Sequence, residues 1–314
     1  MNNHAMKVFS GSGNPALAKQ IASFLGTDLG KVELKRFNDG EQYARFLEDV
    51  RGTDLFLVQS TCRPVSENLM ELLMMLDAAK RSSASRITAV MPYFGYARQD
   101  RKAASREPIT AKLVANLLEE AGANRVLTMD LHSDQIQGFF DIPVDNLVAA
   151  PLLMKDFRDK GLSNLVVVAP DAGSAKNSTK VSKALGVGLA IVNKMRPKAG
   201  VAEALNIIGE VKGKNCVMFD DMIDTAGTIC ASADALKKSG CKNVFVCSTH
   251  GIFSGPAFER IEKSGIDAVL VTDTIPQAEL KSGKISVLSV ASLFARAIGR
   301  IHKNESVSSL FDGF

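Results

Sequence analysis

Residues 217–228 read Val217-Met-Phe-Asp-Asp-Met-Ile-Asp-Thr-Ala-Gly-Thr228, a short apolar run followed by acids and then by small residues. The pattern predicts a strand over 216–219 that ends at Asp220 and Asp221, then a loop, then a helix from Ile229. Unpaired N–H groups at the positive end of a helix favour a phosphate, and small residues let it approach the backbone. Paired carboxylates suit ribose hydroxyls or a hydrated Mg²⁺ ion. We interpret the stretch as a cradle for a sugar 5-phosphate; the alternative is an acidic turn and a helix N-terminus without a ligand.

The rest of the chain alternates apolar runs of strand length with segments of helical periodicity. Strands are predicted over 8–9, 54–59, 86–91, 125–129, 165–169, 189–192, 216–219, 244–248 and 268–271, and helices over 15–24, 66–81, 109–121, 179–185, 229–239 and 257–264. Residues 130–151 are rich in turn signals. Nearly continuous Val, Ile and Leu strands that alternate with helices indicate parallel sheets covered on both faces. The predicted fold class is therefore α/β.

The two halves of the chain have similar patterns, which predicts an N-terminal domain over 1–146 and a C-terminal domain over 147–314. Strands in both halves end at acidic turns, which contain Asp130 in the first half and Asp171 and Asp220 in the second. In open α/β sheets, ligands bind beyond the carboxyl ends of the strands. We therefore expect the functional side chains at these turns.

Composition narrows the functional class. The 314 residues are 46% hydrophobic and 23% charged, as in soluble globular proteins. The net charge of +4 comes without a long basic run, so we expect no nucleic-acid partner. No apolar stretch approaches the ~18–20 residues of a membrane span, and the first residues lack the apolar core of a signal peptide. Five scattered cysteines without a Cys-x-x-Cys pair indicate a reducing cytoplasm.

Two segments of the first half could bind a nucleotide. Pro92-Tyr-Phe-Gly-Tyr-Ala-Arg98-Gln99-Asp100-Arg101-Lys102 follows a predicted strand, and it combines a stacking surface with cations that bind phosphate. The alternative is a charged surface loop. Arg36-Phe-Asn-Asp-Gly-Glu41 joins two strand-like runs, and Asp-Gly is a standard hairpin pair. In the functional interpretation, Phe37 stacks and the acids bind an amino group.

Two further groups could act on phosphates. Asp130-Leu-His132 and Asp171 could bring an imidazole and a carboxylate to one metal ion, although a single His after a strand is more often a hydrogen-bonded structural residue. Lys194 and Arg196 follow a predicted strand at positions i and i+2 and could converge on a transferring phosphate. By itself, such a pair usually forms a solvated turn.

Common nucleotide motifs are absent or incomplete. The chain contains no G-x-x-x-x-G-K-[ST] sequence, so a triphosphate would not be held by a P-loop. Gly11-Ser-Gly13-Asn-Pro-Ala16 matches G-x-G-x-x-A, but Glu33, the acid at the required distance, lies inside a strand-like run. We predict that this turn serves the start of a helix.

Taken together, these segments resemble the ribose-phosphate pyrophosphokinase family, also called phosphoribosyl pyrophosphate synthetases. The resemblance runs from about Lys7 to Phe311 and is similar to the phosphate-activated, hexameric class. It is carried by Arg36–Glu41, Pro92–Asp100, Asp130–His132, Gln135–Phe140, Pro143–Asn146, Pro170–Gly173, Lys194–Pro197, Val217–Thr228 and Thr249–Gly255. It implies two similar domains of the type I phosphoribosyltransferase kind and a homohexamer built from dimers.

The resemblance also implies the reaction and the residues that perform it. The family transfers the β,γ-diphosphoryl group of ATP to the anomeric hydroxyl of ribose 5-phosphate and releases AMP. It assigns Mg²⁺ to His132 and Asp171, and charge stabilisation to Lys194 and Arg196. ATP would contact Phe37, Asp39, Gly40 and Glu41 of a neighbouring subunit, together with Arg98, Gln99, Asp100 and Lys102. Ribose 5-phosphate would contact Arg196, Asp220, Asp221, Asp224, Thr225, Ala226, Gly227 and Thr228.

The chain departs from the family pattern at a few positions. Ser174 and Asn177 stand where a second Gly and an Arg are common, with Lys176 between them, and Ala103-Ala104 follow Lys102.

We expect loops 98–107 and 194–203 to act as lids that exclude water. Two rival interpretations are a phosphoribosyltransferase, which consumes the product, and a non-catalytic associated subunit. The paired N-terminal segments argue against the first, and the intact Lys-x-Arg and Pro-Asp-x-Gly segments argue against the second.

Overall fold

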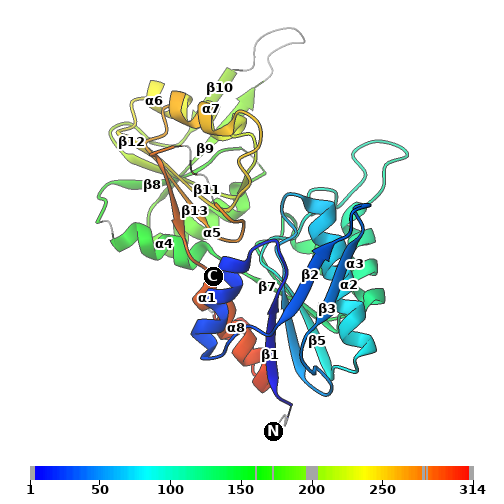
Figure 1. The fold of residues 1–314 in the computed structure, drawn as a ribbon. Helices are drawn as coiled ribbons and strands as arrows, with labels where there is room; N and C mark the ends of the chain where they lie inside the picture. Colours follow the sequence, from blue (N-terminus) through cyan, green and yellow to red (C-terminus); the bar gives the residue numbers. More distant parts are fainter. Residues whose placement is uncertain are drawn as a thin grey trace. The chain divides into compact units, whose positions relative to one another are not determined.

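The computed structural model describes residues 4–159, 161–171, 173–195, 204–277, 280 and 282–310 (Figure 1). The chain divides into two compact units. Unit 1 comprises Met1–Val148, Thr274–Pro276 and Ser289–Asp312, and unit 2 comprises Ala149–Asp273, Gln277–Leu288 and Gly313–Phe314. Each unit has its own sheet with helices packed on it, so the predicted α/β fold class is confirmed.

Unit 1 contains a parallel sheet whose strands, among the described residues, run in the order β1-β4-β5-β6-β7. The strands are β1 (Met6–Ser10), β4 (Asp54–Val58), β5 (Arg86–Met91), β6 (Arg125–Met129) and β7 (Val144–Leu147). Every residue of β4 is buried, as expected for a central strand covered on both faces. Helices α1 (Pro15–Leu25) and α8 (Ala291–Lys303) lie on one face, and α2 (Val65–Arg81) and α3 (Thr110–Ala121) on the other (Figure 1).

A separate antiparallel hairpin, β2 (Val32–Arg36) and β3 (Gln42–Phe46), belongs to unit 1 and packs against α2. Its turn is the Arg36–Glu41 segment, in which Gly40 has φ +97°, a left-handed conformation that glycine adopts without strain. The predicted hairpin turn is therefore confirmed. An ion pair between Arg36 and Glu67 of α2 further joins the hairpin to the unit.

The C-terminal helix α8 was not predicted from the sequence. We expected residues 147–314 to form one domain, but α8 groups with unit 1, where it packs on α1. A buried carboxylate fixes this placement. Asp54, only 1% exposed, accepts hydrogen bonds from Arg86 and is 2.7 Å from Nδ1 of His302 on α8, while Arg86 also donates to the carbonyl of Ile301. Local pattern does not reveal this long-range network.

Unit 2 contains the larger sheet, with the described strands in the order β10-β9-β8-β11-β12-β13-β14. These are β8 (Leu165–Ala169), β9 (Gly188–Met195), β10 (Ala204–Ile208), β11 (Asn215–Ile223), β12 (Asn243–Gly251), β13 (Ala268–Thr272) and β14 (Ile285–Leu288). All neighbouring pairs are parallel except β9 and β10. Helices α6 (Gly227–Lys238) and α7 (Ala257–Lys263) cover one face, and α4 (Ala150–Asp159) and α5 (Ala175–Leu185) complete the helices of the unit.

Several short elements were not predicted. Residues 130–151, expected to be turns, contain a 3₁₀ helix at Asp134–Phe139, strand β7 and the start of α4, and strands β10 and β14 were also missed. A second 3₁₀ helix lies at Ser308–Leu310. β7, β10 and β14 are edge strands of four or five residues, too short to give a periodic signal. In the described part of the chain, no helix combines the length and the apolar character that a membrane crossing requires.

Candidate active site

The acids of β11 lie inside the strand, which corrects the predicted end at Phe219. β11 runs to Ile223 because it stays paired with β12 over its whole length, whereas its pairing with β8 ends at Met218. Asp220 and Asp221 thus lie in the part of β11 that extends beyond its pairing with β8 but is still paired with β12. Both are partly buried, and pairing of Asp220 with Ser248 and of Met222 with His250 on β12 holds them at the carboxyl end of the sheet.

Asp220 is held in an unfavourable environment for a charge. Desolvation by burial, together with the neighbouring carboxylates of Asp221 and then Asp171, raises its pKa to about 8. The N–H of Asp221 donates to Oδ1 of Asp220 (2.9 Å), which opposes the shift. Carboxylates that crowd together in this way are the donor set that a hydrated divalent cation prefers, because the cation offsets their mutual repulsion.

Asp171 is fixed by a tight polar turn at the end of β8. Its Oδ1 accepts the N–H of Ser174 (2.9 Å), and the Ser174 hydroxyl donates to the carbonyl oxygen of Asp171 (3.0 Å). Helix α5 begins at Ala175, directly after this turn and four residues earlier than predicted. The carboxylate that the resemblance assigns to Mg²⁺ is thus held by the backbone N–H of Ser174, whereas the serine hydroxyl, the departure from the family pattern, contacts only the backbone of Asp171.

The small-residue loop connects β11 to α6. Ala226 has φ +60°, a left-handed conformation that costs a non-glycine residue roughly 1–2 kcal/mol. Helix α6 begins at Gly227 without a side-chain cap in the described chain, so its first N–H groups are oriented for an outside acceptor. The loop has the features predicted for an anion cradle: small residues, a helix N-terminus and acids immediately before it.

The segment after β12 supports this loop. The carbonyl of Ile223 accepts N–H groups from Ile252 (2.9 Å) and Phe253 (3.0 Å), and the carbonyl of Asp224 accepts the N–H of Ser254 (3.1 Å). The Ser254 hydroxyl also donates to the Asp224 carboxylate. Ser254 lies in the quoted Thr249–Gly255 segment, but no role was predicted for it, because its partner is 30 residues earlier, in the connection that follows β11.

The hairpin of unit 1 exposes an aromatic side chain. Phe37 is 47% exposed, its ring lies 5.8 Å from that of Tyr43 in an edge-to-face arrangement, and the Lys35 ammonium lies 4.6 Å from the Tyr43 ring centroid. Asp39 accepts the N–H of Glu41 (3.1 Å), and residues 39–41 are all exposed. Phe37 thus offers a free face for stacking on a planar ring.

The aromatic-basic loop brings its residues together only in part. Tyr93, Phe94 and Ala97 are buried, whereas Arg98 and Gln99 are exposed. Gln99 is tied to the start of α3, where its side-chain oxygen accepts the Thr110 hydroxyl (2.5 Å) and its carbonyl accepts the N–H of Ala111 (3.1 Å). Lys102 is exposed and Asp100 is partly buried. Tyr93 and Phe94 therefore anchor the loop, and of the predicted stacking surface only Tyr96 is partly exposed.

His132 lies on an exposed turn after β6. The turn is shaped by Asp130, which has φ +40°, and by the Asn146 side chain, whose oxygen accepts the N–H of Leu131 (3.1 Å). His132 belongs to unit 1 and Asp171 to unit 2, so their joint metal ligation stays a prediction. The described residues contain no cluster of three or more His, Cys, Asp or Glu side chains arranged for a metal ion.

Of the two predicted catalytic cations, the structure describes only the backbone of Lys194, near the end of β9. The backbone of Lys194 belongs to this strand, opposite Leu205 of β10. Arg196 and the rest of the expected lid, 196–203, lie outside the described residues. The other expected lid, 98–107, is a loop in which the N–H groups of Ala103 and Ala104 donate to the Glu107 carboxylate (2.8 and 2.9 Å).

The glycine turn after β1 is filled by the protein itself. Oε1 of Glu71, a residue of α2 that is 6% exposed, accepts the N–H (2.7 Å) and hydroxyl (2.9 Å) of Ser12, and the N–H of Gly13 donates to Gln59 (2.8 Å). A Cβ at Gly13 would lie 2.4 Å from the carbonyl oxygen of Ser60. Asn14 caps α1. The predicted role of this turn at the start of a helix, rather than in dinucleotide binding, is thus supported.

Comparison with known proteins agrees with this arrangement. Residues 6–122 match the family model of the N-terminal domain of ribose phosphate pyrophosphokinase, and residues 192–312 match that of the phosphoribosyl synthetase-associated domain. The chain is 56% identical over 317 residues to a ribose-phosphate pyrophosphokinase of Clostridium perfringens, covering 99% of both chains. It is 54% identical to one of Fusobacterium nucleatum, covering 99% of this chain and 100% of that one.

A solved structure shows the same fold. The phosphoribosylpyrophosphate synthetase of Mycobacterium smegmatis superposes with a TM-score of 0.90 at 43% identity, covering 96% of this chain and 99% of that one. Likeness of this extent spans nearly the whole length of both chains. By sequence and by structure, the chain belongs to the ribose-phosphate pyrophosphokinase family.

Proposed function

We propose that this chain transfers the β,γ-diphosphoryl group of ATP to the anomeric hydroxyl of ribose 5-phosphate, giving phosphoribosyl pyrophosphate and AMP. The observation that carries the proposal is the loop between β11 and α6, where partly buried acids lead into a strained turn and an uncapped helix N-terminus. Family membership supports the reaction, and the loop supports the position of the phosphorylated sugar within unit 2.

In this proposal, ribose 5-phosphate binds along the loop. The 5-phosphate accepts N–H groups of Thr225 to Thr228, where the helix dipole adds attraction for a dianion. The carboxylates of Asp220, Asp221 and Asp224 accept hydrogen bonds from the ribose hydroxyls. Family membership also assigns Arg196 to this substrate.

Mg²⁺ fits the donor set beside the sugar. Asp171 supplies a carboxylate at the end of β8, next to the crowded acids of β11, and His132 is the second assigned ligand. When bound, the ion would neutralise charge on the phosphates of ATP and of the developing product. Such an ion would also offset the mutual repulsion of the neighbouring carboxylates, which contributes to the raised pKa of Asp220.

ATP binds at loops of unit 1. Arg98, Gln99, Asp100 and Lys102 are assigned to the nucleotide and its phosphates, and Phe37, Asp39, Gly40 and Glu41 to adenine. The exposed ring of Phe37 and the turn beside it offer the stacking face and acceptors that an aminopurine needs. In this proposal the hairpin serves the nucleotide of a neighbouring subunit, in a homohexamer built from dimers.

Lys194 and Arg196 act on the transferred group. Diphosphoryl transfer needs in-line positioning and charge neutralisation rather than a covalent nucleophile. These two cations would stabilise the charge that develops between the α-phosphate of ATP and the transferring β-phosphate. Such preorganised contacts typically contribute ~10²–10³ in rate.

Product analysis tests the reaction. The purified chain is incubated with ATP, ribose 5-phosphate and Mg²⁺, and the nucleotide products are separated. AMP in a one-to-one ratio with phosphoribosyl pyrophosphate is expected. ADP as the product would indicate transfer of a single phosphoryl group and contradict the proposal, and consumption of phosphoribosyl pyrophosphate with a nucleobase would favour the transferase interpretation.

Variants test the residue assignments. Lys194→Ala should lower kcat by ~10²–10³ while the melting temperature stays unchanged. Phe37→Ala should raise the KM for ATP. If adenine is bound in trans, mixing these two inactive or impaired variants should restore part of the activity, because hybrid dimers regain one complete site. No restoration, together with a monomer in light scattering, would contradict the oligomeric assignment.

The cellular location follows from the same proposal. Its substrates are nucleotide and sugar phosphate, and the five cysteines are buried and free. Both points favour a reducing, cytoplasmic compartment. Fractionation of the source cells would check this assignment.

A further inference from the structure

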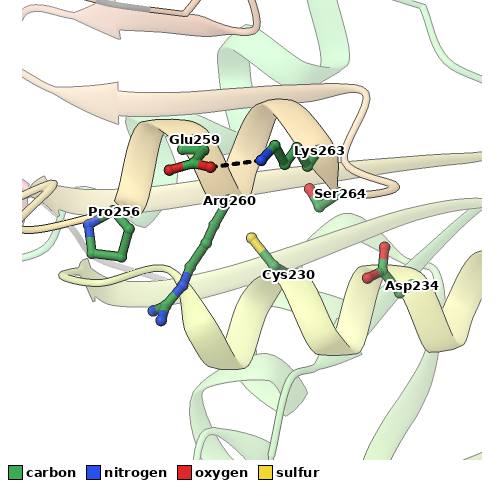
Figure 2. Close-up of a pocket in the computed structure, with 7 residues that line it drawn as sticks. All are labelled: Cys230, Asp234, Pro256, Glu259, Arg260, Lys263 and Ser264. Carbon is green, nitrogen blue, oxygen red and sulfur yellow. Dashed lines mark hydrogen bonds and ion pairs between the residues drawn. The ribbon is translucent and has the colours of Figure 1, made fainter.

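A guanidinium from α7 holds the loop between β11 and α6. Nη1 of Arg260 donates a hydrogen bond to the carbonyl oxygen of Thr225 (3.0 Å), and a Cβ built on Gly227 would lie 3.5 Å from the same nitrogen. Figure 2 shows the Arg260 side chain extending from α7 toward the beginning of α6. The groove beside it, about 360 Å³, is lined by Cys230, Asp234, Pro256, Glu259, Arg260, Lys263 and Ser264.

This hydrogen bond fixes the direction of one peptide group. In a planar trans peptide, the carbonyl and the following N–H point in opposite directions. Because the Thr225 carbonyl points to Arg260, the N–H of Ala226 points to the other side of the loop. The contact therefore determines which of these two groups, a donor or an acceptor, is presented to a ligand there.

The loop's own strain opposes this orientation. Ala226 has φ +60°, which an L-residue with a Cβ adopts only at a cost. Rotation of the 225–226 peptide would relieve that strain by changing φ at Ala226. It would also turn the Thr225 carbonyl toward the anion and the Ala226 N–H away from it, replacing attraction by repulsion.

The main-chain hydrogen bonds that support this loop act on residues before the 225–226 peptide, whereas Arg260 acts on that peptide itself. The main-chain hydrogen bonds from Ile252, Phe253 and Ser254 fix the carbonyls of residues 223 and 224, before the strained position. On α7, Glu259 pairs with Lys263 (2.6 Å), on the opposite side from the guanidinium of Arg260 in Figure 2.

We propose that Arg260 is a positioning residue for ribose 5-phosphate. It acts through Thr225, keeping the 225–226 peptide in the strained orientation that directs the Ala226 N–H toward the 5-phosphate. The inference rests on the proposed function, because it needs the phosphate to lie at this loop.

Steady-state kinetics and direct binding test the proposal. Arg260→Ala should raise the KM and the dissociation constant for ribose 5-phosphate about tenfold, as for one lost hydrogen bond to a charged donor, with the KM for ATP and the melting temperature unchanged. Arg260→Lys, which keeps the charge with a shorter reach, should give an intermediate value. Lys263→Ala, on the same helix, is the matched control and should match the parent protein.

A second substitution separates positioning from packing. Ala226→Gly removes the strain, since glycine adopts positive φ freely. In the Arg260→Ala background it should therefore restore the KM for ribose 5-phosphate to within about threefold of the parent value, a non-additive result in a double-mutant cycle. A change of less than twofold in Arg260→Ala, an equal rise in the KM for ATP, or no restoration by Ala226→Gly would overturn the proposal.

A third variant separates this inference from the proposed function. Thr228→Glu places a carboxylate in the cradle and should abolish ribose 5-phosphate binding if the phosphate lies there. If Thr228→Glu has no effect, the assigned phosphate site is wrong. If Thr228→Glu abolishes binding and Arg260→Ala does not weaken it, the site stands and the role of Arg260 fails.

Discussion

The molecule contains two strand-to-helix turns of similar appearance, one after β1 in unit 1 and one after β11 in unit 2. Both are rich in small residues and both precede a helix. In the first, Asn14 caps α1 and the buried Glu71 carboxylate accepts the N–H and hydroxyl of Ser12. In the second, α6 starts without a side-chain cap in the described chain, and the acids stand before the loop rather than within it.

The difference shows what makes such a turn a ligand site. A helix N-terminus always attracts an anion, and the protein can supply that anion itself. Where a carboxylate from α2 occupies the turn, the result is a rigid joint between elements. Where the turn stays uncapped, the same backbone remains available to a phosphate. Whether a protein carboxylate already occupies the turn is thus a better indication of ligand binding than the number of glycines in the turn.

The largest predicted effect comes from making the second turn like the first. Thr228→Glu supplies an internal carboxylate at the start of α6, so the KM for ribose 5-phosphate should rise by ~100-fold or more through lost N–H donors and charge repulsion. The melting temperature should hold or rise slightly, because a negative charge stabilises a helix N-terminus. Steady-state kinetics and calorimetry check both parts. If Thr228→Glu keeps the parent affinity for ribose 5-phosphate, the turn after β11 is not the phosphate site and does not differ from the turn after β1 in this respect.

The converse change, Glu71→Ala, removes the carboxylate that occupies the turn after β1. Glu71→Ala leaves Ser12 and the Gln59 amide without their buried acceptor, which should lower the free energy of unfolding by about 2–3 kcal/mol. Urea denaturation followed by tyrosine fluorescence is a suitable measurement, since Tyr43, Tyr93 and Tyr96 are the tyrosines of the chain and all lie in unit 1. The KM for ribose 5-phosphate should stay unchanged in the folded Glu71→Ala protein. A raised KM under conditions in which the variant is fully folded would show that this turn also binds ligand.

A smaller effect is expected at the cap of the first helix. The Asn14 side chain accepts the N–H of Leu17 (3.3 Å), so Asn14→Ala should lower the free energy of unfolding by about 1 kcal/mol. The same urea titration measures it. Ala226→Asn is the informative counterpart in the second turn: an asparagine there tolerates positive φ, so the fold should be unharmed.

The smallest effect concerns a partly exposed carboxylate of unit 1, Glu48, for contrast with buried Glu71. A hydrogen bond from Lys7 lowers the pKa of Glu48 from its usual 4.5, with help from the N–H of Lys31. Because its folded-state pKa is depressed, Glu48 contributes stability above pH 4.5, and this contribution is lost as the pH falls through the folded-state pKa. Glu48→Gln should thus lower the melting temperature slightly at pH 7 and not at all near pH 3. A large fall in the melting temperature of Glu48→Gln at pH 7 would show that the Lys7–Glu48 pair stabilises the fold as much as buried Glu71 does.

Much of this arrangement follows from local sequence. The central strands and most helices are apolar runs with clear periods, and the acids at the carboxyl ends of β8 and β11 mark the ligand edge of unit 2. The Asp-Gly pair identifies the hairpin turn. In each case, the residues that decide the conformation lie within a few positions of one another.

What the sequence does not reveal depends on distant partners. Asp220 lies within a strand because β12 pairs beyond the point where β8 stops, and α8 joins unit 1 because Asp54 and Arg86 bind its end. Arg260 reaches a loop carbonyl 35 positions earlier. Such contacts are set by how elements pack, which no local period encodes.

The placement of α8 has a consequence for the nascent chain. Every segment of unit 2 except its last two residues precedes Ser289, whereas unit 1 needs α8 to cover α1 and to meet the buried Asp54 carboxylate. Because synthesis runs from the N-terminus, residues 149–288 emerge before this helix, so the unit that begins first is completed only after the body of unit 2 has been made. Until residues 291–303 emerge, the surface of α1 that packs on α8 is not covered by that helix.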